Sequence, residues 1–204
     1  MANTFDVVKR FEKDICNYTG AKYAVTCTSC TSAILLTCAY FRKTTWRYES
    51  KALWLPRYTY VGVAQSVIHA GFEIYFSNKL WQGGYQLHPL PVWDYARRFT
   101  SNMYRPGEFH CVSFHVTKIL GLKGHGGAIL HDNDDADCWL RRARFDGRKE
   151  GVPPKDDEFT PGWHVYLLPQ VAAEGRKQIK LIPKTNEDLP WDDYSDLSKQ
   201  EIFR

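Results

Sequence analysis

The segment Tyr23–Tyr40, YAVTCTSCTSAILLTCAY, sets the expectation for the fold. Its first five residues predict a short strand, and the stretch Ala33–Tyr40 is apolar all round, which predicts a buried helix. The polar run Thr28–Ser32 lies between them and is typical of a turn that opens a helix. A strand that leads through a short polar loop into a buried helix is a building unit of α/β proteins.

The same alternation continues along the chain. Further strands are predicted at residues 52–56, 73–76, 91–94, 110–114 and 126–130. Further helices are predicted at about 8–18, from 61 to near Gly71, from 133 to a close at Gly147, and at 169–179. Asn3 or Thr4 is predicted to cap the first helix, and Gly20 to end it. Strands that alternate with helices predict an α/β fold, a three-layer α/β/α arrangement with a mainly parallel sheet.

The composition suits a globular domain. The 204 residues are 44% hydrophobic and 25% charged, which excludes a disordered chain, and no apolar run is long enough to span a membrane. The N-terminus lacks a basic stretch followed by an apolar one, so we expect no secretory signal and a cytoplasmic location. The net charge of +4 is below that of a dedicated nucleic-acid binder, and the basic cluster 141–149 is expected at a solvated helix end.

Six cysteines in a chain without an export signal predict reduced thiols. Cys27 and Cys30 form a C-x-x-C sequence, but zinc would need a second ligand pair, and no other such sequence exists; no metal site is expected. A thioredoxin-like role needs this sequence to open a helix after a strand, and that context is present. A redox protein is therefore one open alternative for this loop.

Ligands of an open α/β sheet sit at the carboxyl ends of its strands, so polar residues after the strands are the candidate site residues. The hydroxyls of Thr28–Ser32 either cap the following helix or cradle a phosphate. An aromatic residue in Tyr58–Tyr60 either packs or stacks on a planar ring. Asp94 is either a helix cap or the partner of a cationic ligand atom.

Lys118 follows the strand at 110–114 and precedes the glycine-rich stretch 121–127. Most single lysines are surface residues, but a lysine beside Ser113 and His115 at the ligand edge is a candidate amine nucleophile. A phosphate cradle, an aromatic ring, a carboxylate and a lysine are together the parts of a pyridoxal phosphate (PLP) site.

The chain resembles the DegT/DnrJ/StrS family of fold-type-I PLP-dependent enzymes, which aminate keto sugars on nucleotides. The resemblance runs from about Phe11 to Pro183, and its segments are Gly20–Val25, Ser29–Ala33, Pro56–Tyr60, Val92–Ala96, Ser113–Lys118, Gly126–Ile129, Gly162–His164 and Pro169–Ala173. It implies the large domain of these enzymes and an aminotransferase. That enzyme would move an amino group from an amino acid, expected to be glutamate, to a keto sugar nucleotide through a Lys118 aldimine.

Residue roles follow from the same resemblance. The residues that it assigns to PLP are Ser29, Cys30, Thr31, Tyr60, Asp94, Arg97, Ser113, Lys118 and His164, and those that it assigns to catalysis are Lys118, Asp94 and His115. Tyr60 would stack on the ring and Asp94 would pair with the pyridine nitrogen. The loop at Gly162–His164 is similar to one that completes the neighbouring subunit's site, which implies a homodimer.

The chain also departs from the family pattern. Cys30 replaces a glycine of the phosphate loop, Arg97 stands where a glutamine usually lies near the ring hydroxyl, and His164 replaces an asparagine that meets the phosphate. Tyr166 replaces a usual arginine in the same stretch. Each replacement alters a group expected to touch the cofactor.

The resemblance also shows missing pieces. About fifteen residues separate Phe76 from Val92, where the family places another strand and helices, and the resemblance leads us to expect a form without the family's small C-terminal domain. We expect residues 1–183 to form a shortened PLP-binding large domain. We expect residues 184–204 to form an acidic tail that lies over the surface or a partner subunit, or is frayed. Compact forms of this kind resemble those of virus genomes, which would act in the host cytoplasm.

Since the small domain normally closes over the substrate, its loss leaves an alternative to the enzyme. In that alternative, the chain is a binding or scaffold protein with the PLP fold but without transaminase activity.

Overall fold

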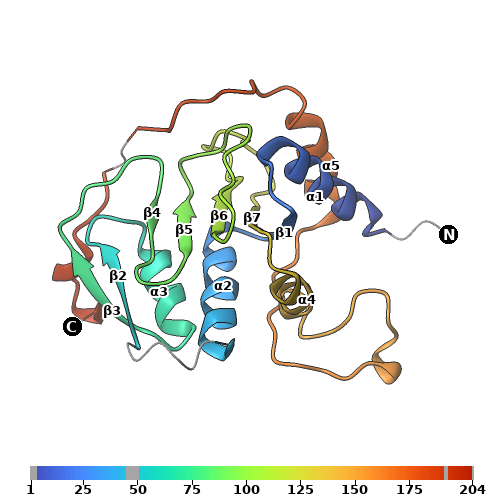
Figure 1. Cartoon of the computed structure of the whole chain (residues 1–204), viewed down its shortest axis with the longest axis horizontal. Helices are drawn as coiled ribbons and strands as arrows, with labels where there is room; N and C mark the ends of the chain where they lie inside the picture. Colours follow the sequence, from blue (N-terminus) through green and yellow to red (C-terminus); the bar gives the residue numbers. More distant parts are fainter. Residues whose placement is uncertain (1–3, 45–50, 191–192, 204) are drawn as a thin grey trace.

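The computed structural model describes residues 4–44, 51–190 and 193–203 of the chain. Its elements in chain order are α1 (Asp6–Thr19), β1 (Tyr23–Cys27), α2 (Cys30–Thr44), β2 (Ala52–Pro56), α3 (Val61–His69), β3 (Glu73–Ser77), β4 (Tyr85–Gln86), β5 (Val92–Tyr95), β6 (Phe109–Ser113), β7 (Gly127–His131), α4 (Asp134–Ala143) and α5 (Pro169–Gln178), with short 3₁₀ turns at Pro154–Asp156, Leu197–Lys199 and Glu201–Phe203 (Figure 1). Each helix and strand predicted from the sequence is present, and β4 is an addition.

The ends of α1 test the predicted caps. Gly20 ends the helix as predicted, with φ of 81° and its N–H donating to the Cys16 carbonyl. The predicted start is wrong for Thr4, because Phe5 is the N-cap and makes no side-chain capping bond. Asn3 lies outside the described residues.

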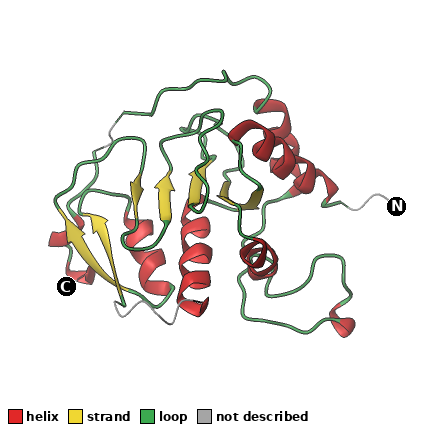
Figure 2. Cartoon of the chain, in the orientation of Figure 1, coloured by secondary structure: helices red, strands yellow, loops and turns green. Residues whose placement is uncertain are grey.

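The strands lie between two layers of helices (Figure 2). Successive residues of β7 face opposite layers: Ile129 packs with α2, α3 and α4, whereas Ala128 and Leu130 pack with α1 and α5. Every residue of β6 and β7 is buried, as expected for strands that are covered on both faces. The predicted three-layer α/β/α class is therefore confirmed.

The prediction of a mainly parallel sheet is wrong in its strand pairing. One sheet has the order β1-β7-β6-β5-β4, in which only β5 and β6 pair in parallel among the described strands, and β2 and β3 form a separate parallel pair. The connections explain the difference. Residues 87–91 alone join β4 to β5, and residues 114–126 join β6 to β7 without a helix, and such connections suit antiparallel neighbours.

The strands β1, β2, β3, β5 and β6 nevertheless run in one direction. Strand β7 is antiparallel to both β1 and β6, so these two agree, and β5 is parallel to β6. An antiparallel bridge between Trp54 and His88, just after β4, gives β2 and β3 the same direction. The carboxyl ends of these strands therefore meet at one edge, the upper edge for β5 and β6 in Figure 1.

The C-terminal segment packs on the rest of the chain. After α5 it crosses above the upper ends of β5 and β6 and descends beside β3 (Figure 1). Leu197 is buried in the core, and Asn186 donates to the Phe99 carbonyl at 3.1 Å. The described residues of this segment therefore contact the rest of the chain, and Leu197 contributes to its core.

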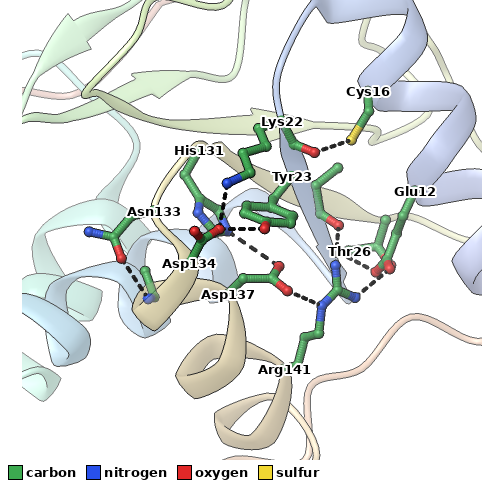
Figure 3. Close-up of polar contacts among 12 residues, drawn as sticks. Glu12, Cys16, Lys22, Tyr23, Thr26, His131, Asn133, Asp134, Asp137 and Arg141 are labelled. Atoms are coloured by element: carbon green, nitrogen blue, oxygen red, sulfur yellow. Dashed lines mark hydrogen bonds and ion pairs between the residues drawn. The ribbon is translucent and has the colours of Figure 1, made fainter.

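A buried ionic cluster joins α1, β1 and α4 (Figure 3). Glu12 accepts hydrogen bonds from the Thr26 N–H at 3.0 Å and from Arg141 at 2.6 Å, and it also pairs with Arg144. Burial alone would raise the pKa of Glu12, but the charges of Arg144 and Arg141 outweigh it and lower this pKa to about 2. The expected solvated helix end is thus wrong for Arg144, whose side chain is buried against Glu12.

Candidate functional site

A cavity of about 380 Å³ lies among the loops that follow the strands. Its lining residues are Ser29, Cys30, Thr31, Ile34, Thr59, Tyr60, Val63, Trp81, Asp94, Ala96, Ser113, His115, Thr117, Lys118, His125, Gly126 and Tyr194. Because β1, β2, β5 and β6 all end at this edge, side chains far apart in the sequence meet here. Eight of the ten residues predicted for the site line this one cavity.

The loop between β1 and α2 forms one wall. Ser29 acts as the helix cap, because its hydroxyl accepts from the Ser32 N–H at 3.0 Å, and the two hydroxyls also contact each other at 3.0 Å. A Cβ on Gly127 would lie 2.4 Å from the carbonyl carbon of Ser29, so only glycine lets β7 approach this loop. The structure confirms the helix cap for Ser29, while the phosphate cradle stays a prediction; backbone N–H groups and hydroxyls at a helix start suit an anion.

The C-x-x-C thiols lack the features of a redox pair. Cys27 donates to the Ser29 carbonyl, and the Cys30 sulfur lies 3.4 Å from the Cys111 carbonyl and 3.7 Å from Asp94. Burial raises the pKa of Cys27 to about 12 and holds the pKa of Cys30 well above its usual range. Reactive thiols need a lowered pKa, so this geometry argues against the redox alternative.

Asp94 lies at the end of β5, and its side chain is almost fully buried in the cavity wall. It accepts a hydrogen bond from the Ala96 N–H at 2.9 Å. Burial raises its pKa, while hydrogen bonds from Ala96, Tyr85 and Cys30 and the charge of Lys118 act in the opposite direction. The cost of burying this carboxylate in its charged form would be offset by a cationic ligand atom that is buried beside it.

Tyr60 caps the start of α3 with an extended backbone, and its side chain is 56% exposed at the cavity. A Cβ on Gly62 would lie 2.6 Å from the Tyr60 ring and 3.1 Å from Thr31, so the glycine makes room for that ring. An aromatic face held open to a cavity can receive a planar ligand.

Lys118 and His115 lie on the loop after β6. The Lys118 N–H donates to the His115 carbonyl at 2.8 Å, and this turn sets both side chains at the cavity. The His115 ring contacts Thr117 at 2.9 Å and lies 4.7 Å from the ring of His125. Burial, followed by the charges of His125 and Lys118, lowers the pKa of His115, which favours the neutral imidazole.

Two of the predicted residues do not line the cavity. The Arg97 guanidinium is directed to the C-terminal segment, where it donates to the Tyr194 hydroxyl at 3.2 Å and to the Pro190 carbonyl. His164 is exposed and pairs with Asp146 at 2.8 Å. The Arg97 guanidinium is thus engaged by the C-terminal segment and the His164 side chain is exposed, and the cofactor contacts expected of both residues stay predictions.

Several lining residues escaped the sequence analysis. The rings of Trp81 and Tyr194 stack with their centroids 5.9 Å apart. The hydroxyl of Thr59 contacts the hydroxyl of Tyr85 at 2.6 Å. Trp81 and Tyr194, which line the cavity, lie in the shortened connection and the tail, where no strand pattern marked a ligand edge; Tyr85 lies behind the lining residue Thr59. His125 lies within the glycine-rich stretch, and its φ of 61° is rare for a residue other than glycine. The structure reveals this backbone conformation, and the sequence pattern did not predict it.

A larger open groove of about 870 Å³ lies between α1 and α4. None of the predicted site residues lines it, so the smaller cavity is the better candidate on chemical grounds. Among the described residues, no group of three metal-ligating side chains is present, and no helix is long and apolar enough to cross a membrane.

Residues 2–79 match the DegT/DnrJ/EryC1/StrS aminotransferase family. This range contains the β1–α2 loop and Tyr60, and it ends before Asp94 and Lys118. The expected resemblance is therefore confirmed for this part of the chain. A comparison with curated proteins gave no significant match.

Solved structures of aminotransferases share the fold over most of the chain. A DegT DnrJ EryC1 StrS aminotransferase from Brucella abortus matches with a TM-score of 0.70 at 18% identity, over 86% of this chain and 58% of that one. AtS13 from Actinomadura melliaura gives a TM-score of 0.72 at 15% identity, over 85% and 59%. Helicobacter pylori PseC, an aminotransferase involved in the biosynthesis of pseudoaminic acid, gives 0.68 at 16%, over 86% and 57%.

These similarities confirm the fold-type-I aminotransferase fold. The chain spans less than two thirds of the length of each of these three structures.

Proposed function

We propose that this chain is the PLP-binding domain of a sugar aminotransferase. The observation that supports the proposal most strongly is that Ser29, Tyr60, Asp94 and Lys118, from separate segments, line one cavity at the carboxyl edge of the strands. The reaction would transfer an amino group from an amino acid, with glutamate the expected donor, to a keto sugar nucleotide. The fold and the family match over residues 2–79 support this choice of chemistry.

The lining residues fit PLP by their chemistry. Hydroxyls of Ser29, Thr31 and Ser113 and the start of α2 would hold the phosphate, and Tyr60 would cover one ring face. The buried Asp94, whose pKa is raised mainly by burial, would hold a proton on the ring nitrogen and gain a cationic partner. Lys118 would bind the aldehyde carbon. When bound, the cofactor supplies an electron sink for the amino-group transfer.

The chain's own groups would move the proton. Lys118, once displaced by the incoming amine, would take the proton from the substrate carbon at Nζ and return it to the cofactor side. His115, neutral because of its lowered pKa, would accept or relay a proton near the same loop. Cys30 stands at the position of the family's phosphate-loop glycine. Its sulfur lies 3.7 Å from Asp94 and would help to hold that carboxylate in place.

We also propose that the working unit is a homodimer with a shared site. His164 is 71% exposed by its side chain and does not line the cavity of its own chain. We infer that it meets a phosphate in the cavity of a second copy, which is the arrangement that the family resemblance implies. Residues 1–183 would form the domain that dimerises.

Covalent capture tests cofactor binding. The purified protein incubated with PLP and then with borohydride is expected to gain the reduced cofactor on the peptide that contains Lys118, as read by mass spectrometry. Lys118→Ala should abolish the capture, whereas Lys123→Ala, at an exposed position outside the cavity, should leave it unchanged. Equal capture in wild type and Lys118→Ala would refute the assignment of Lys118.

A glutamate half-reaction separates the enzyme from a binding or scaffold protein. Added glutamate should convert bound PLP to its amine form, visible as loss of the long-wavelength absorbance and formation of 2-oxoglutarate. If the protein captures PLP through Lys118 but never converts it, the result supports cofactor binding and contradicts the proposed aminotransferase activity.

A further inference from the structure

The cavity has one wall from the far end of the chain. Tyr194 lies in the segment after α5 and lines the cavity together with Trp81, on which it stacks at 5.9 Å with an interplanar angle of 27°. The segment reaches this place by crossing above β5 and β6 (Figure 1). A residue of the tail is therefore in contact with the same space as Lys118 and Asp94.

Contacts outside the cavity hold the segment on both sides of Tyr194. On the N-terminal side, Asp188 accepts two hydrogen bonds from Arg98, at 2.8 and 2.5 Å, and the Leu189 N–H donates to the Arg97 carbonyl at 2.9 Å. On the C-terminal side, Asp196 pairs with an arginine of the β2–α3 loop. These contacts fix the two flanks of the aromatic residue.

The C-terminal side is also anchored by packing. Asp196 lies 2.7 Å from Arg57, and the next N–H, that of Leu197, donates to the Arg57 carbonyl at 2.9 Å. Leu197 is only 3% exposed and belongs to the same core as α2 and α3. Neither the two aspartates nor Leu197 lines the cavity, so the anchors can be altered without touching it.

Arg97 couples the tail to the strand that carries Asp94. Its Nε donates to the Tyr194 hydroxyl at 3.2 Å, its guanidinium lies 5.7 Å from the ring centre, and it also donates to Pro190. This guanidinium is buried, so its hydrogen bonds are shielded from solvent and fix the ring direction. Arg97 is thus a positioning residue that acts through Tyr194.

We propose that the C-terminal segment, over its described residues 184–190 and 193–203, is a wall of the candidate site, and that Tyr194 closes the cavity against Trp81 and shields Lys118. The contacts of the segment with Arg97, Arg98 and Arg57 support the wall, whereas its effect on PLP binding rests on the proposed function. The position of the anchors fits this role: they hold the segment from outside the cavity, and of the described residues after position 184, Tyr194 is the one that lines it.

Acylation of the cofactor-free protein tests the wall without relying on PLP. Lys118 modification by N-acetoxysuccinimide is followed by mass spectrometry, with Lys123 as the internal reference. In Tyr194→Ala and in the double variant Asp188→Asn/Asp196→Asn, the Lys118 rate should rise by about fivefold or more, since a docked segment opens less often than a released one. Tyr194→Phe keeps the ring and its contact with the Arg97 guanidinium but loses the hydrogen bond, so its Lys118 rate should rise less than that of Tyr194→Ala.

The control variant is Phe159→Ala, because Phe159 is 63% exposed and does not line the cavity. It should leave the Lys118 rate unchanged, and an unchanged Lys123 rate in every variant excludes general unfolding. If Tyr194→Ala and the double variant both react at the wild-type rate, the segment is no wall and the proposal is overturned.

A second measurement separates this proposal from the proposed function. The PLP dissociation constant, read by absorbance, should rise about fivefold in the double variant, although neither aspartate lines the cavity. If the wild type takes up no PLP, the proposed function fails while the acylation result still decides the wall. If the wild type captures PLP through Lys118 and the double variant binds it equally well, the wall proposal fails alone.

Discussion

Asp94 shows how a single residue can trade stability for function. Its pKa is raised mainly by burial, so the folded protein favours the protonated acid. A folded-state pKa above the unfolded value means that stability falls as pH rises from the ordinary aspartate pKa through the raised one. When Asp94 is ionised in the unliganded protein, its buried carboxylate lowers stability, and a cationic ligand atom buried beside it would offset this cost.

Asp94→Asn is predicted to separate these two effects. The cofactor-free variant should be at least as stable as the wild type in urea at pH 7.5, because the amide keeps the hydrogen bond from Ala96 and carries no charge. The glutamate half-reaction should slow by about 10²–10³-fold, as on loss of one preorganised electrostatic partner. Asp156→Asn, at an exposed position, is the matched control. A variant less stable than the wild type at pH 7.5 would contradict this account.

The elements α1, β1 and α4 depend on one buried carboxylate. Glu12 on α1 accepts from Thr26 on β1 and pairs with Arg141 on α4 and with Arg144 just after it. Because Arg144 is only 3% exposed, the removal of Glu12 leaves a buried guanidinium without this counter-charge. The sequence analysis placed the arginines at a helix end, and packing turned them into a link between layers.

Glu12→Gln is predicted to lower the free energy of unfolding by about 3–5 kcal/mol. The pKa of Glu12 is about 2, below its ordinary value of 4.5, so its stabilisation is complete above pH 4.5 and is lost as pH falls toward 2. Urea unfolding from pH 7 to 2.5 should show this loss in the wild type and a flatter profile in the variant. Asp14→Asn, also on α1, removes only a partly exposed pair with Arg176 and should cost less than about 1 kcal/mol.

At the scale of the whole molecule, the proposed homodimer makes a complementation prediction. Lys118→Ala removes the attachment point within a chain, and His164→Ala removes the group offered to the neighbour. When equal amounts of the two variants are unfolded and refolded together, they should form mixed dimers, in each of which one of the two sites is intact. PLP capture at a limiting cofactor concentration should then recover to about a quarter of the wild-type amount, since half of the dimers are mixed. Capture that equals the average of the two separate variants would contradict a shared site.

The sequence by itself determined the order and the type of the elements. Apolar periodicity and glycine positions located β1 at its observed residues and ended α1 at Gly20, because these signals are local. The residues after each strand were also recognised as candidates, and eight of them line one cavity. That outcome follows from a common strand direction, which places the ends of β1, β2, β5 and β6 at a single edge.

Only the tertiary structure decided the strand pairing, the place of Arg97 and the part played by the tail. Pairing depends on which strands become neighbours, and β4 and β7 run opposite to the rest because their connections to β5 and β6 are short or lack a helix. Arg97 is held by Tyr194 and Pro190, nearly a hundred residues away in sequence, and no local pattern encodes such a contact. Local periodicity fixes what each segment becomes, whereas the packing of distant segments fixes which side chains share a cavity.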